Sequence, residues 1–167
     1  MSQEINPNDS LNEFDKPKLP TSLNVLTILT ITWTSIEFCL NIYGFFTAKT
    51  SYDKLKDAID SGKMDKMPKF IGTPEEMLSM SLKRLDNKLP LLILGLVAAA
   101  LCFYGALEMR KMKKQGYTFW LAGELLPFIT AAFFLGMAAF SGFGLLFVLF
   151  PLIFIILYTV NRKHLVN

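Results

Sequence analysis

Hydrophobic residues gather in four long blocks that polar segments separate. The blocks cover approximately residues 23–46, 89–107, 117–140 and 144–160. Because about 20 residues at a rise of 1.5 Å cross the hydrocarbon core of a bilayer, each block is long enough for a membrane-spanning helix. Such uniformly apolar blocks do not fit the alternating strands of a membrane barrel. The pattern therefore predicts an all-α membrane protein, with a four-transmembrane-helix bundle over residues 23–160.

The polar segments complete this domain organisation. Residues 1–22 are polar and contain three prolines, which favours a flexible tail, and residues 161–167 form a short basic tail. The apolar run 117–160 would make one helix of about 66 Å, twice what a bilayer needs. Its glycines near Ser141–Gly144 therefore predict the break between the third and fourth spans.

The polar segment 47–88 between the first two spans is predicted to be a partly helical external loop. Thr73 is a capping residue that precedes a proline and two acids, which is typical of a helix start. Leucines then recur at helical spacing and predict an amphipathic helix that leads into the second span; they are Leu78, Leu82, Leu85 and Leu89. A shorter helix is expected over residues 52–61. These helices cap the bundle, lie on the membrane or dock a partner.

Four spans place both ends of the chain on one side. The linker 108–116 on that side is strongly basic, so the positive-inside rule predicts cytoplasmic termini. The loop 47–88 carries about as many cations, but acids alternate with them. Aromatic residues near the inner span ends are expected to form an interfacial belt: Tyr104, Tyr117, Trp120 and Tyr158.

Composition adds little chemistry to this picture. The net charge of +3 does not indicate a nucleic-acid partner. Both cysteines, Cys39 and Cys102, fall in apolar blocks, and His164 is the single histidine. The sequence contains no clustered metal ligands, no phosphate-binding glycine loop and no nucleophile placed beside a base. We therefore expect no metal, no cofactor and no enzymatic activity.

The first span carries a polar seam. Its members recur at spacings of three and four residues, which places them on one helix face: Thr27, Thr30, Thr34, Glu37, Asn41 and Gly44. Because a polar face in lipid is costly, the seam should face the bundle interior or a partner helix. It has three interpretations, namely polar contacts between helices, a proton or cation relay, and contact with a partner subunit.

The second span carries small residues at the same period. They are Gly95, Ala98 or Ala99, Cys102, and Gly105 or Ala106. Small residues let the backbones of two helices approach closely. The two patterns predict that the second span packs with this seam against the first.

Two carboxylates lie within the predicted spans, Glu37 and Glu124. A charged carboxylate inside a bilayer is costly, so each must be protonated or have a partner. Their predicted depths differ by about 10 Å, which argues against a direct pair. Pro127 leaves a carbonyl near Gly123 without its helical donor. Glu124 is therefore expected to hydrogen-bond into that gap or into the first-span seam.

The lysine-rich linker 109–117, followed by Gly123–Glu124–Leu125–Leu126–Pro127, resembles a group of small four-span membrane proteins of Bacteroidota-type bacteria. The resemblance extends over most of the chain and includes Lys18–Leu19–Pro20. It implies four spans in a bacterial inner membrane. It implies no activity and therefore assigns no functional residue. Small multidrug-resistance transporters also have four spans and a carboxylate in the first, but their loops are far shorter.

The sequence thus favours an accessory or scaffolding subunit of a membrane complex, which acts through helix-packing surfaces. Its expected partners are the lipid bilayer and other membrane subunits or further copies of the chain. The alternative is a small proton- or cation-coupled transporter or channel that uses Glu37 or Glu124. A sensor that reads its surroundings through residues 47–88 is a weaker third hypothesis.

Overall fold

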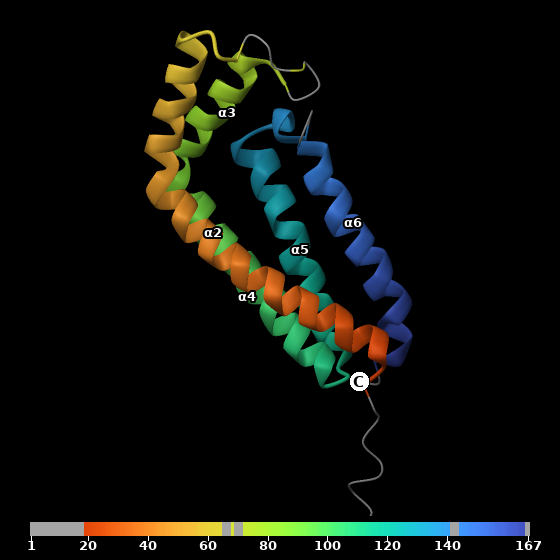
Figure 1. The fold of residues 1–167 in the computed structure, drawn as a ribbon. Helices are drawn as coiled ribbons and strands as arrows, with labels where there is room; N and C mark the ends of the chain where they lie inside the picture. Colours follow the sequence, from red (N-terminus) through yellow and green to blue (C-terminus); the bar gives the residue numbers. More distant parts are fainter. Residues whose placement is uncertain (1–18, 65–67, 69–71, 141–143, 166–167) are drawn as a thin grey trace, which may run out of the picture.

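The computed structural model describes residues 19–64, 68, 72–140 and 144–165, and the described part of the chain contains helices and no strand (Figure 1). The helices are α2 (Thr21–Asp60), α3 (Pro74–Asp86), α4 (Lys88–Arg110), α5 (Lys114–Phe134) and α6 (Gly144–Asn161). Short 3₁₀ helices η2 (Met137–Phe140) and η3 (Arg162–His164) flank α6. Within the described residues, α2, α4 and α5 are long and apolar enough to cross a membrane. The chain is therefore compatible with an integral membrane protein.

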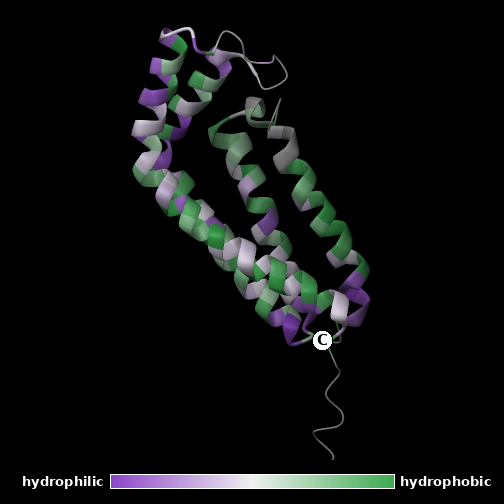
Figure 2. Ribbon diagram, viewed as in Figure 1, coloured by the Kyte–Doolittle hydropathy of each residue, from purple (hydrophilic) through white to green (hydrophobic). Residues whose placement is uncertain are grey.

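Helix α2 runs for 40 residues, well beyond the expected end of the first span at residue 46. The expected boundary at Thr47 is not a break in the backbone, and the separate helix expected over residues 52–61 is the end of α2. The physical reason is that no glycine or proline lies between Gly44 and Gly62, where the backbone turns with a φ of 68°. Figure 2 shows that this last part of α2 is mostly hydrophilic.

Helix α3 lies beside the polar end of α2, and the two form a helical hairpin at one end of the molecule (Figure 1). The predicted start of α3 is confirmed. The Thr73 side chain accepts from the backbone N–H of Glu76, the Glu76 carboxylate accepts from the N–H of Thr73, and Pro74 is the first helical residue. At its other end, Lys83 donates to the Leu135 carbonyl at 3.3 Å, which ties α3 to the end of α5.

Helix α4 is the central element, because it packs against both α5 and α2. Helices α4 and α5 touch through glycine. A methyl group on Gly105 would lie 2.5 Å from the backbone nitrogen of Trp120 and 2.7 Å from the Gly116 carbonyl oxygen. The two helices are joined by a tight turn in which Met112 has a φ of 62°. Most helices that end this way have glycine there, because a side chain is strained in that conformation.

Helix α5 ends at Phe134, six residues before the expected end of the third span at residue 140. The physical reason is Gly136, which has a φ of 84° and donates its N–H to the Ala131 carbonyl. Helix α6 begins at Gly144, as predicted. Most of the expected break, residues 141–143, lies outside the described residues.

Helix α6 is attached to the bundle mainly near its C-terminal end. Tyr158 is buried there, and Asn161 accepts a hydrogen bond from Ser22 of α2 at 2.6 Å. Elsewhere α6 has few contacts with α2 and α5. The described helices therefore converge at the end that carries the C-terminus and diverge toward the α2–α3 hairpin (Figure 1).

We expect Gly105→Ala to lower the free energy of unfolding by about 1–3 kcal/mol, because the added methyl group meets the backbone of α5 and the helices must separate. Thermal unfolding in mild detergent, followed by circular dichroism, measures this effect. Gly44→Ala is the matched control, because a methyl group there meets nothing within 4 Å. Equal destabilisation by both variants would contradict a close contact between α4 and α5.

Candidate functional site

The polar seam of α2 is mostly occupied by hydrogen bonds within α2 itself. Thr27, Thr30 and Thr34 are buried, and the Thr34 hydroxyl donates to the Thr30 carbonyl at 2.9 Å. Thr27 donates to the Asn24 carbonyl at 3.0 Å, and the Asn41 amide donates to the Glu37 carbonyl at 2.9 Å. Hydroxyls that bond back to their own helix are a common way to satisfy polar groups in an apolar environment. Among the described residues, no hydrogen bond joins the side chains of two members of the seam, because these donors bond to backbone carbonyls.

One member of the seam bonds to another helix. Thr30 and the Tyr158 hydroxyl of α6 lie 2.8 Å apart, and both residues are buried. The Tyr158 ring packs on Trp120 of α5, with 4.3 Å between the ring centroids. Tyr158 thus connects α6 to α2 through a hydrogen bond and to α5 through its ring.

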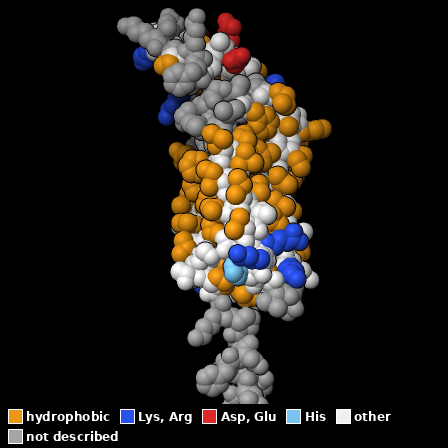
Figure 3. Space-filling model, turned by 90° about the vertical axis from the view of Figure 1, so that its right-hand side faces the viewer, with side chains coloured by type: hydrophobic (Ala, Val, Ile, Leu, Met, Phe, Trp, Pro, Cys, Tyr) orange, Lys and Arg blue, Asp and Glu red, His pale blue; other side chains and the backbone are white. Residues whose placement is uncertain are grey.

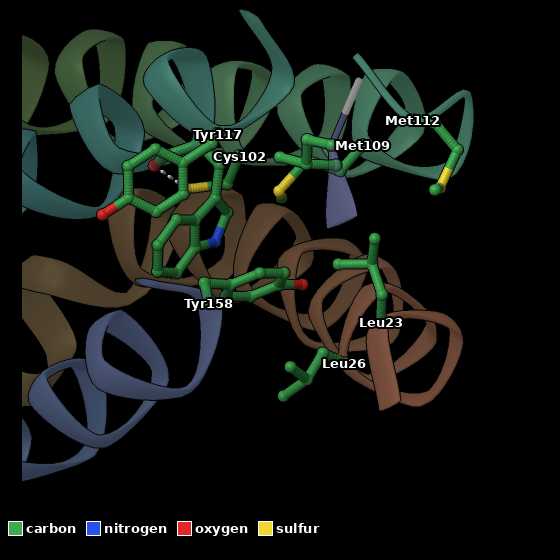
Figure 4. Close-up of a cluster of buried hydrophobic side chains, with 9 residues drawn as sticks. Leu23, Leu26, Cys102, Met109, Met112, Tyr117 and Tyr158 are labelled. Carbon is green, nitrogen blue, oxygen red and sulfur yellow. Dashed lines mark hydrogen bonds between the residues drawn. The ribbon is translucent and has the colours of Figure 1, made fainter. Parts of the chain in front are cut away.

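The aromatic residues at this end form a core. Trp120 and Tyr158 are 1% exposed and Tyr117 is 9% exposed, so the expected interfacial belt is wrong for all but Tyr104, which is 48% exposed. Figure 4 shows Tyr117 and Tyr158 together with Cys102 and Met109 in this cluster. The belt was predicted from position along the spans, which does not reveal that the helices converge here and enclose the rings.

The small residues of α4 serve two neighbours instead of the one that the sequence predicted. Gly95 faces α2, where a methyl group would overlap the Asn41 side chain, and Ala99 lines a groove with Thr34 of α2. Gly105 instead meets the backbone of α5, and the Cys102 thiol donates to the Trp120 carbonyl at 3.6 Å. Gly95 and Ala99 lie toward the edge of this face that meets α2, whereas Ala98, Cys102 and Gly105 lie toward the edge that meets α5.

The two carboxylates of the predicted spans, Glu37 on α2 and Glu124 on α5, are both partly buried. The Cys102 thiol donates to Glu124 Oε2 at 3.7 Å. This thiol is the partner of Glu124 in place of the first-span seam or the gap left by Pro127. Gly123 packs closely on Cys102 and Ala98 of α4. In the described part of the chain, neither carboxylate has an ion pair.

An open groove of about 360 Å³ lies between α2 and α4, and neither Glu37 nor Glu124 lines it. It is mainly apolar and is lined by Thr34, Ser35, Phe38, Cys39, Ala99 and Phe103. The Thr34 and Ser35 hydroxyls donate to carbonyls of their own helix. The groove therefore offers shape and apolar surface but few polar groups to a ligand.

Sequence reasoning missed a second charged group, Glu108, at the turn between α4 and α5. Its side chain is 5% exposed, and each carboxylate oxygen lies 2.7 Å from a lysine, Lys111 or Lys113. Hydrogen bonds from Lys111 and then from Lys113 hold the pKa of Glu108 below its usual value. The spacing of three residues between Glu108 and Lys111 is the feature of the sequence that indicates this ion pair.

No protein-family model, curated protein or solved structure matches this chain. Within the described residues, no three His, Cys, Asp or Glu side chains are grouped so that they could hold a metal ion. The arrangement offers two partly buried carboxylates, a groove and apolar helix faces. These features suit binding between helices.

We expect a double-mutant cycle between Thr30→Val and Tyr158→Phe to give a coupling energy of about 0.6–1.7 kcal/mol, the range for hydrogen bonds between membrane helices. The measurement is the free energy of unfolding in detergent of the wild type, the two single variants and the double variant. Thr32→Val is the control partner, because its hydroxyl is exposed and bonds to the Ile28 carbonyl. A coupling as large with Thr32→Val would show that Tyr158 does not act through Thr30.

We expect Glu108→Gln to destabilise the protein at neutral pH but not in acid. The pKa of Glu108 is lowered in the fold, so the unfolded chain, with a carboxyl pKa of about 4.3, binds the proton first. The stabilisation is therefore present above about pH 4.3 and is lost as the pH falls through the folded pKa. Midpoints of thermal unfolding from neutral to acid pH should converge for wild type and variant. Asp53→Asn, at an exposed position on α2, is the control, and a constant gap for Glu108→Gln would contradict the ion pair.

Proposed function

We propose that the chain is an accessory subunit of a membrane protein complex, which binds a larger membrane protein through its intramembrane helix surfaces. The observation that carries this proposal is the pair of partly buried carboxylates, Glu37 and Glu124, which have no ion pair among the described residues. They lie where the helices begin to diverge, so a helix of another subunit can approach them. A polar or basic side chain on that helix would satisfy both.

The loose attachment of α6 supports a binding role. Helices in lipid are held together by packing and by hydrogen bonds between them, since lipid tails are as apolar as leucine. Helix α6 has such contacts near Tyr158 but few along the rest of its length, where large apolar side chains are exposed: Leu149, Phe150, Leu152, Ile153 and Ile156. An apolar pocket of about 160 Å³ between α5 and α6 adds a concave site for a partner's side chain.

The hydrogen bonds of the seam argue against the alternative, a proton or cation relay along α2. A relay needs side chains that hand a proton from one to the next. The threonines and Asn41 instead donate to carbonyls of α2, and Thr30 pairs with Tyr158. The seam therefore fits polar contacts within and between helices better than it fits a conduction path.

The proposal includes a topology. The three helices that are able to span a membrane are joined by α6 as a fourth span, which returns the C-terminus to the side where α2 begins. The basic residues of the α4–α5 turn and of η3 lie on that side, so it is the cytoplasmic side of a bacterial inner membrane under the positive-inside rule. The α2–α3 hairpin would then extend into the periplasm as a second contact for the partner.

We expect the chain to co-purify from native membranes with a larger membrane protein, after solubilisation in mild detergent and mass spectrometry of the crosslinked partners. Glu37→Leu with Glu124→Leu should abolish this complex, because no acceptor remains for the partner's polar group. Glu37→Gln with Glu124→Gln keeps hydrogen bonding and should retain part of the complex.

The control for this experiment is Glu75→Gln, an exposed carboxylate in the first turn of α3, which should leave the complex intact. Circular dichroism of each purified variant separates loss of binding from loss of fold. Recovery of wild type from native membranes only as a monodisperse monomer would overturn the accessory role.

A further inference from the structure

The described carboxylates are unevenly distributed between the two ends of the molecule: acids alternate with cations on the α2–α3 hairpin, whereas the other end is mainly basic. The end formed by the α4–α5 turn and η3 carries Arg110, Lys111, Lys113, Lys114, Arg162, Lys163 and His164. The described residues of that end include one carboxylate, Glu108. In Figure 3, Lys, Arg and His side chains lie next to one another directly below a broad band of hydrophobic side chains.

Glu108 pairs with two of these cations and leaves the others available to bind an anion. One of its carboxylate oxygens lies 2.7 Å from Lys111 Nζ and the other lies 2.7 Å from Lys113 Nζ. No described carboxylate pairs with Lys114, Arg162 or Lys163, and all three side chains are exposed.

Tyr117 connects the two segments that carry Lys114 and Arg162, which are far apart in the sequence. The Arg162 guanidinium lies over the Tyr117 ring, 5.2 Å from its centroid, and the Tyr117 hydroxyl lies 2.9 Å from Thr159 Oγ1. Lys114 precedes Tyr117 by three residues on α5, so both are on the same helix face. Leu165, which is 4% exposed, packs in the core cluster and fixes η3 against the bundle.

We propose that Lys114 and Arg162, with Lys163 beside them, form a binding site for the phosphate of an anionic phospholipid. A planar guanidinium and an ammonium are suited to phosphate oxygens. A lipid is favoured over a soluble anion because Lys114 begins the apolar helix α5 and Arg162 follows the end of the apolar helix α6, so acyl chains can lie along both helices. The site does not depend on a partner subunit.

Native mass spectrometry of the full-length protein, titrated in detergent with phosphatidylglycerol or phosphatidylcholine, tests this site. Wild type should retain phosphatidylglycerol preferentially. The variant Lys114→Gln with Arg162→Gln should bind it roughly 25-fold more weakly, from about fivefold for each cation, and added salt should weaken binding to wild type. Lys54→Gln with Lys56→Gln, exposed on the polar end of α2, is the matched control and should bind as wild type does.

Each contrary outcome is distinct. Equal binding of the two lipids, or an equal loss in the Lys54 and Lys56 control, would overturn the site. Displacement of phosphatidylglycerol by millimolar inorganic phosphate would show a site for a soluble anion and would overturn the lipid assignment. If the double variant does not fold, Lys114→Gln alone keeps the contact between Arg162 and Tyr117, and it should still weaken binding about fivefold.

Discussion

The close contact between α4 and α5 is the constraint on which the rest of the structure depends. Lipid supplies no hydrophobic driving force between helices, so association requires backbones that approach closely. Gly105 and Gly116 permit this, and neither tolerates a methyl group without displacing backbone atoms. The contact fixes Trp120 against α4, and Trp120 in turn provides the surface on which Tyr158 of α6 packs. Helix α6 is therefore positioned by a contact to which it does not itself contribute.

The same contact restricts the backbone conformation of the turn between α4 and α5. Two helices this close leave few residues to connect them, and Met112 adopts a left-handed conformation to do so. The turn also buries Glu108, whose charge is compensated by lysines from the turn itself. A buried carboxylate without such partners would be strongly destabilising. The basic character of the linker thus has a local structural cause in addition to any effect on membrane orientation.

The sequence predicted the elements better than their ends or their neighbours. Hydrophobic blocks and the Thr73 cap located the helices, because length, apolarity and capping are local properties. Helix α5 ends earlier than predicted because Gly136, whose φ is 84°, ends it before the glycines at 142 and 144 are reached. The small residues of α4 were assigned to one neighbour, since spacing along one helix cannot say where the next helix lies. The sequence does not reveal that Glu108 is buried, because it is the turn between α4 and α5 that buries it. The pairing of Glu124 with Cys102 likewise depends on the approach of α5 to α4.

The two ends of the molecule differ in how firmly they are held. At the basic end, an aromatic core, the ion pairs of Glu108 and hydrogen bonds between α2 and α6 act together. Toward the α2–α3 hairpin, Lys83 donates to the end of α5, and α6 has few contacts with its neighbours. A region with few and exposed contacts unfolds locally at a low free energy, whereas a packed core unfolds only at a high free energy. This difference fits the proposed role, in which a partner helix binds at the less firmly packed end while the basic end stays folded.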